Sequence, residues 1–145
     1  MNWKYSRREF PIEVVNIDED GVHIVCKNRL APGYWWIIDT GASTSVIDTN
    51  CSDHFEIVFE STTQAAVGVL ENQVETKKGN AQIIDIEGHL FENIDCVVIP
   101  LNHVNEIYQT QADIKICGII GCDLLVDNKA VIDLAKLKIR LKNIR

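Results

Sequence analysis

The sequence contains few of the residues that mark disordered or fibrous proteins. It has 8 Gly and 3 Pro among 145 residues, scattered without repeats or low-complexity tracts. Disordered chains are also poor in hydrophobic residues, whereas 46% of this chain is hydrophobic. The length and composition therefore predict one globular domain spanning residues 1–145.

The chain also lacks long hydrophobic runs and any excess of positive charge. Basic residues lie near the start, but no apolar stretch follows them, so we expect no signal peptide and a cytoplasmic protein. The alternative is an exported protein whose leader has been removed. No segment approaches the length of a membrane span, and the net charge is −7. We therefore expect neither nucleic acid nor membranes as partners.

Cysteine and histidine do not form a metal-binding pattern. The five cysteines are odd in number and irregularly spaced, which suits reduced thiols better than a disulfide framework. Cys51, Asp53 and His54 are potential ligands, but no Cys-x-x-Cys or spaced His pair accompanies them. We predict no metal and no cofactor.

The one basic cluster lies near the end of the sequence and consists of Lys136, Lys138, Arg140, Lys142 and Arg145. From residue 136 to 142 the charged side chains alternate with leucine and isoleucine, which is the period of a strand. Two interpretations are open: a polyanion site, or the solvent-facing side of an edge strand that cations protect from aggregation. We favour the edge strand.

Two-residue alternation dominates the chain, so we predict many short strands. A hairpin is expected from Ile12–Ile17 and Val22–Cys26 around the turn at 18–21. Five further strands are expected. Three are Asn72–Lys77, Ala81–Glu87 and Phe91–Ile99, and the other two form a final hairpin of Ala130–Asp133 with Leu137–Leu141. Lys78-Gly79-Asn80 is expected to separate the first two of these strands.

Helical periodicity appears in only two short segments. These are Asn102–Thr110, with Asn102 as the expected cap, and Asp123–Asn128. Short strands with one or two helical turns predict a mainly-β domain, closed or sandwiched.

An apolar run, Tyr34–Ile38, leads directly into Asp39-Thr40-Gly41-Ala42. Burial disfavours a charged carboxylate, so an acid at the end of a buried strand needs hydrogen bonds, neutralisation or a functional cleft. Asp39 either caps a turn by accepting bonds from nearby amides or acts in chemistry. A second segment, Ile119-Ile120-Gly121 before a short helix, favours the chemical role.

Together these two segments resemble the retropepsin-like aspartic proteases, especially their bacterial members. The resemblance runs from Phe10 to Leu141, which it implies as the core of the domain. It includes Ile84-x-Ile86-x-Gly88-His89, which is similar to the strand and turn after the flap of retroviral enzymes. The resemblance implies a mainly-β, closed barrel-like acid-protease fold with one or two short helices, and aspartic endopeptidase activity.

The resemblance also implies roles for individual residues. Asp39 is expected to be the catalytic carboxylate. Thr40 is expected to brace the paired loops across a dimer axis, and Gly41 to offer its carbonyl to substrate. The support of the active-site loop is then Thr40, Gly41, Ala42, Ile119, Ile120 and Gly121, and the substrate-binding flap is Gly68, Val69 and Leu70.

Two positions depart from the retroviral pattern. Retroviral enzymes usually have an Arg after the second motif and an Asp after the first, which pair at the subunit boundary. Here Cys122 and either Ser43 or Thr44 occupy those positions, so a dimer contact must be built differently. The flap segment has Gly68 as its only glycine, where retroviral flaps are glycine-rich.

Peptide hydrolysis of this kind needs two carboxyl groups that share one proton. The chain has one Asp-Thr-Gly; Asp133 comes nearest elsewhere but lacks the glycine. We therefore expect a homodimer that pairs Asp39 with its own copy, cleaving polypeptides through an activated water without a covalent intermediate. The alternative is a catalytically inactive retropepsin-like module for dimerisation or peptide binding.

Overall fold

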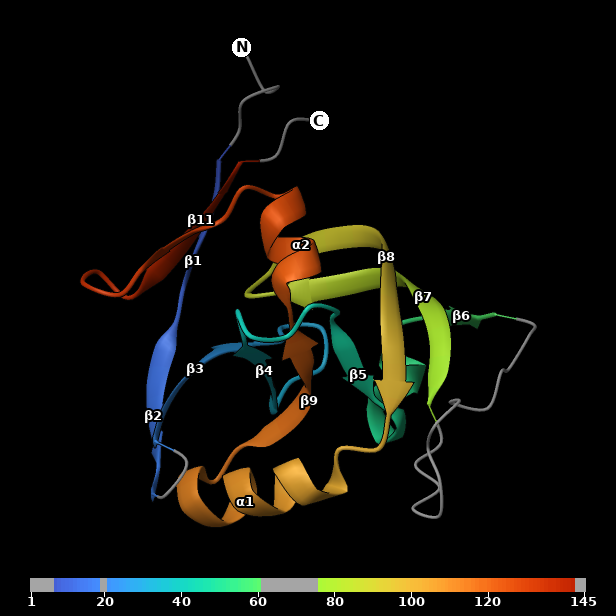
Figure 1. Cartoon of the computed structure of the whole chain (residues 1–145), viewed down its shortest axis with the longest axis horizontal. Coiled ribbons are helices and arrows are strands. Elements are labelled where there is room, and N and C mark those ends of the chain that lie inside the picture. The colour runs from blue at the N-terminus through green and yellow to red at the C-terminus, as the bar shows by residue number, and fades with distance from the viewer. Residues whose placement is uncertain (1–6, 19–20, 61–75, 143–145) are drawn as a thin grey trace.

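The computed structural model describes residues 7–18, 21–60 and 76–142. Strands dominate this part of the chain and form two sheets (Figure 1). The smaller sheet has the order β1-β11-β10, with β1 at Arg7–Pro11, β11 at Lys138–Lys142 and β10 at Val131–Asp133. Both of its pairings are antiparallel.

The larger sheet has eight strands in the order β2-β3-β4-β9-β5-β8-β7-β6. Their bounds are β2 Glu13–Ile17, β3 Gly21–Lys27, β4 Tyr34–Ile38, β9 Lys115–Ile120, β5 Val46–Asp48, β8 His89–Ile99, β7 Lys77–Ile86 and β6 Ile57–Phe59. The pairs β4–β9 and β5–β8 are parallel. Within the described residues the edge strands β2 and β6 do not pair with each other, so the mainly-β prediction is confirmed with an open sheet.

Short helical segments accompany the sheets in the described part of the chain. They are the 3-10 helix η3 (Thr49–His54), α1 (Asn102–Ala112) and α2 (Cys122–Asp127). Both predicted helices are present, but Asn102 does not cap α1. The cap residue is Leu101, without a side-chain bond, and the Asn102 Oδ1 atom accepts a hydrogen bond from Asn50 instead.

The predicted hairpins are present with two corrections. The segments at 12–17 and 22–26 pair as β2 and β3, and the turn at Gly88 joins β7 to β8. However, β7 continues through Gly79, so the predicted turn there is wrong; Asn72 to Glu75 lie outside the described residues. The interpretation of β11 as an edge strand is also wrong, because β1 and β10 flank it.

The apolar run of β4 is buried on both faces. Trp36 and Ile38 pack in the larger core between the sheets, whereas Ile37 packs in a second core beside α1. Because alternate side chains of a strand point to opposite faces, a strand between two cores must be hydrophobic throughout. Burial therefore explains why no polar residue interrupts the sequence before Asp39.

Gly118 on β9 allows close packing against both neighbouring strands, β4 and β5, at the centre of the sheet. A Cβ atom on Gly118 would lie 2.3 Å from the Val46 carbonyl oxygen and 2.6 Å from Cζ3 of Trp36. The pairing of β4 and β9 shifts register next to this contact. This packing holds the ends of the two strands side by side, and both predicted motifs begin there.

Candidate active site

Asp39 follows directly after β4, and the end of β9 fixes its backbone. Its amide donates a hydrogen bond to the Ile120 carbonyl at 3.0 Å. Its Oδ1 atom accepts from the Gly41 amide at 2.8 Å, and its carbonyl accepts from the Ala42 amide at 3.1 Å. The side chain is half-buried, and no described residue forms a hydrogen bond with Oδ2. One carboxylate oxygen is thus held, and the other is available.

The segment after β9 braces the Asp39 loop from the side. The Cys122 amide donates to the Ala42 carbonyl at 2.7 Å, and the Cys122 Sγ atom donates to the Thr40 carbonyl at 2.9 Å. Gly121 permits this approach, because a Cβ there would lie 2.7 Å from the Ala42 oxygen. The two predicted motifs therefore form one hydrogen-bonded unit.

Sequence reasoning missed a second brace between Ser45 and Asp123. The Ser45 hydroxyl donates to Asp123 Oδ1 at 2.7 Å, and the Ser45 amide donates to Oδ2 at 2.9 Å. The same hydroxyl accepts from the Gly121 amide at 2.9 Å. Asp123 lies in the first turn of α2, where an acid is a common helix-start signal, but its partner is 78 residues earlier. Nothing local in the sequence signals that pairing.

The predicted support residues are brought together around Asp39. Thr40 and Gly41 are exposed, Ala42 and Ile119 are half-buried, and Ile120 and Gly121 are buried. Ile119 stands opposite Ile37 in the β4–β9 pairing, one residue before the carbonyl that holds Asp39. The predicted flap residues Gly68, Val69 and Leu70 lie outside the described residues.

Helix α1 covers the second core at the end of β9 opposite to this site. Tyr108 is 3% exposed and packs with Ile37 and Ile116. Its hydroxyl lies 2.5 Å from Nδ1 of His23 on β3. Figure 1 shows α1 running across the lower end of β9, away from the end that leads into α2. The contacts of Tyr108 are thus those of a core-covering residue.

The thiols near the site differ in their surroundings. All five cysteines are free, and four are buried; Cys122 is half-buried. Burial raises the pKa of the Cys117 thiol on β9 well above its ordinary value, so this group stays protonated. Within the described residues, no three His, Cys, Asp or Glu side chains gather as they would around a metal ion. The helices described there are also too short or too polar to cross a membrane.

Comparison with known proteins defines the class. A family model described as aspartyl protease matches residues 31–124, which is more than half of the chain and includes both motifs. The chain belongs to this aspartyl protease family. No curated protein gave a significant match.

Among solved structures, the fold is similar to a retropepsin-like aspartic protease from Rickettsia conorii. The two are 22% identical with a TM-score of 0.50, over 97% of this chain and 95% of that one. The chain is also similar to the retroviral protease-like domain of Ddi1 from Leishmania major, at 18% identity and a TM-score of 0.47, over 87% and 84% of the respective chains. The first likeness agrees with the mainly-β, retropepsin-like fold predicted from the sequence.

Proposed function

We propose that this protein is an aspartic endopeptidase whose active site forms between two copies of the chain. The observation that carries the proposal is the position of Asp39. It follows a strand buried on both faces, its backbone is fixed by Ile120, and one carboxylate oxygen has no hydrogen-bond partner among the described residues. Such a group can contact a ligand without disturbing the fold.

The described part of one chain offers no suitable second carboxylate. Asp123, in the neighbouring motif, already accepts hydrogen bonds on both oxygens from Ser45 and a third from the Leu124 amide. Asp133 lies in the hairpin turn, where it accepts from the Lys136 amide. A two-fold axis beside the exposed residues Thr40 and Gly41 would place Asp39 opposite its own copy.

The chemistry of the pair follows from its shared proton. The ionised carboxylate takes a proton from a water molecule, and the protonated one donates a hydrogen bond to the scissile carbonyl. Water then adds to the carbonyl carbon and gives a tetrahedral diol, whose collapse releases the two peptides. No covalent bond forms between enzyme and substrate.

The remaining roles are part of the same proposal. Thr40, Gly41 and Ala42 shape the loop, Ile119-Ile120-Gly121 supports it, and Gly68-Val69-Leu70 forms the flap over an extended polypeptide. The free cysteines support a reducing compartment such as the cytoplasm, since disulfides form in oxidising ones.

The test compares the wild type with Asp39→Asn on a peptide mixture, with cleavage read by mass spectrometry. We expect the variant to lose activity by about 10²- to 10⁴-fold, because the amide cannot take the proton from water. Asp53→Asn is the matched control, because Asp53 is exposed on η3, away from the motifs, and should retain activity. Sedimentation of both proteins reports whether dimers form.

The two functional hypotheses predict different outcomes. If the wild type dimerises and binds peptides but does not cleave them, the protein is the catalytically inactive module. A wild type that cleaves as a monomer, or an Asp39→Asn variant that cleaves normally, contradicts the paired-carboxylate mechanism.

A further inference from the structure

The basic residues of β11 need an explanation other than edge protection. β11 is the central strand of its sheet, so its backbone is already paired on both sides by β1 and β10. Cations that guard an open strand edge belong on the outer strands. On β11 they instead form a surface. Among the described residues, Lys138 alone of these cations forms an ion pair, with its Nζ atom 3.1 Å from Oε1 of Glu9.

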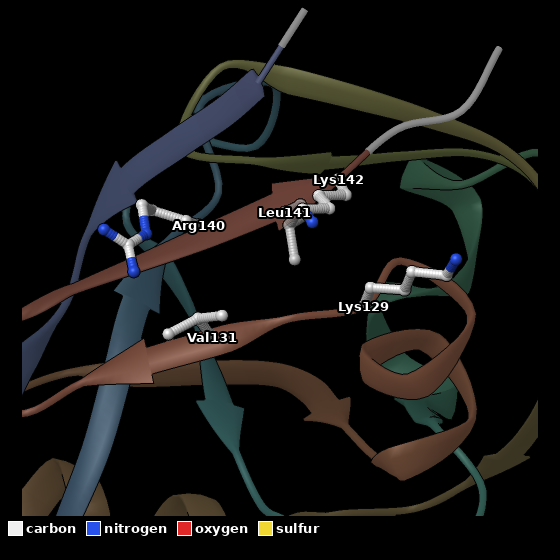
Figure 2. A pocket seen from close by; sticks show the side chains of 5 residues that line it. All are labelled: Lys129, Val131, Arg140, Leu141 and Lys142. Atoms are coloured by element: carbon white, nitrogen blue, oxygen red, sulfur yellow. The ribbon is translucent and has the colours of Figure 1, made fainter. Parts of the chain in front are cut away.

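The unpaired cations line a cavity of about 270 Å³ where β10 and β11 separate. Its lining residues are Lys129, Val131, Arg140, Leu141 and Lys142. Figure 2 shows Arg140, Leu141 and Lys142 along β11 on one side of the opening, and Lys129 and Val131 on the facing segment. Three of the five lining residues are cationic and none is acidic, in a chain whose net charge is −7.

Two acids flank the cations of β11. Glu9, opposite Arg140 in the strand pairing, forms its ion pair with Lys138. Asp133 Oδ1 accepts from the Lys136 amide at 2.9 Å; this bond, and to a smaller extent the charges of Lys136 and Arg140, lower the pKa of Asp133. Among the described residues, Lys129, Arg140 and Lys142 take part in no ion pair. Like charges close together raise the local potential, so the cavity attracts anions from solution.

An open strand edge and exposed apolar side chains adjoin the cavity. In the described chain, β10 pairs only with β11, so its outer edge is free. Val131 is 46% exposed inside the cavity, and Leu134 is 59% exposed in the adjoining turn. A small inorganic anion would use the charges alone, whereas an extended peptide would use the charges, the apolar side chains and the strand edge.

We propose that the β10–β11 hairpin binds an acidic, extended peptide segment of another protein. The segment adds to the open edge of β10 and places carboxylate side chains against Lys129, Arg140 and Lys142. A second copy of this chain would offer the cavity only one carboxylate from its own β10, Asp133, so an acidic segment of another protein is the better complement. Binding at this site does not require activity at Asp39, so it is tested independently of the proposed protease function.

The probe is a fluorescent peptide of about eight residues with alternating Thr and Glu, long enough for one strand. Its control has Gln in place of Glu. Binding is followed by fluorescence anisotropy with the full-length Asp39→Asn chain, which prevents cleavage. We expect the Glu peptide to bind and the Gln peptide to bind about tenfold or more weakly, with the difference decreasing at high salt.

Substitutions then locate the site. Arg140→Gln with Lys142→Gln should weaken binding of the Glu peptide about tenfold or more. Lys78→Gln with Lys115→Gln removes the same charge from exposed positions outside the hairpin and should leave binding unchanged. Methylating alternate backbone amides of the peptide should also weaken binding, because it removes the donors for strand pairing. Thermal unfolding checks that both double variants fold. If the Arg140→Gln, Lys142→Gln variant does not fold, Lys142→Gln alone is measured in its place.

Several results would overturn the proposal. These are equal binding of the Glu and Gln peptides, equal losses in the two double variants, or no effect of backbone methylation. Displacement of the peptide by an equal concentration of inorganic phosphate would indicate a small-anion site instead. Self-association of the wild type that the Arg140/Lys142 variant abolishes, without peptide binding, would indicate a dimer contact.

Discussion

The Asp39 loop and the β10–β11 hairpin differ in how their charged side chains are held. Around Asp39, hydrogen bonds fix the surrounding loops: Cys122 bonds to Thr40 and Ala42, and Ser45 bonds to Asp123. In the hairpin, Arg140 and Lys142 extend from a strand and form no ion pair with any described residue. The Asp39 loop fixes the position of one carboxylate, whereas the hairpin brings several cationic side chains together.

The difference follows from what each kind of site requires. Bond cleavage depends on placing an oxygen within a fraction of an ångström, which needs rigid, hydrogen-bonded support. Attraction between charges falls off slowly with distance and tolerates mobile side chains. We therefore expect substitutions of the buried groups that support the Asp39 loop to lower stability, and substitutions of the hairpin cations to leave it unchanged.

The largest expected effect is at Gly118. Gly118→Ala should lower the free energy of unfolding by about 3 kcal/mol, because the new methyl group meets a backbone oxygen and the Trp36 ring, neither of which can move easily. Gly41→Ala is the matched control. Its Cβ would lie 3.1 Å from Oδ1 of Asp39, at an exposed position, so stability should change little while activity falls. Urea unfolding measures both; equal losses would remove the distinction between strand packing and loop chemistry.

A smaller effect is expected at the Ser45–Asp123 brace. Ser45→Ala should cost about 1–3 kcal/mol, since it leaves the buried Gly121 amide without a partner and removes one of the two hydrogen bonds to Asp123 Oδ1. Ser43→Ala, at an exposed position nearby, should stay within about 0.5 kcal/mol.

A double-mutant cycle with Asp123→Asn tests whether the brace acts as a unit. The combined cost should be less than the sum of the single costs. Strict additivity, measured by the same unfolding experiment, would mean that the two residues stabilise the loop independently.

The smallest effect is a gain in the hairpin. Leu137 has φ +52° in the turn before β11 and is 41% exposed, so it strains the backbone and buries little surface. Leu137→Asn should raise stability by about 0.5–1 kcal/mol, because asparagine adopts this conformation more readily. Leu134→Asn, in the same turn but without a positive φ, should bring no gain. A rise in Tm for both variants would point to a surface effect rather than to backbone strain.

The sequence predicted features that depend on neighbouring residues. Asp39 was identified because its motif and its apolar strand are contiguous, and the hairpins because their turns carry glycine or charged residues. The turn predicted at Gly79 failed for a tertiary reason. Gly79 lies inside β7 where β6 approaches, and a Cβ there would lie 2.8 Å from Cγ2 of Ile57. Close packing, not a turn, accounts for that glycine.

Long-range pairings were beyond local reasoning. The central position of β11 depends on β1, more than a hundred residues earlier, which pairs Phe10 with Ile139. The link from Ser45 to Asp123 likewise joins residues that no shared periodicity connects. Sequence patterns indicate which residues form strands, but neighbours within a sheet are chosen by the packing of the whole chain.

The support of Asp39 by residues 120–123 sets an order of events during synthesis. The ribosome makes Asp39 about eighty residues before the segment that fixes it, and contacts between distant residues form late in folding. An emerging or truncated chain that ends before Ile120 carries the Asp-Thr-Gly motif without its brace. The proposed carboxylate therefore stays unpositioned until residues 120–123 have been made and packed against its loop, which delays its chemistry during synthesis.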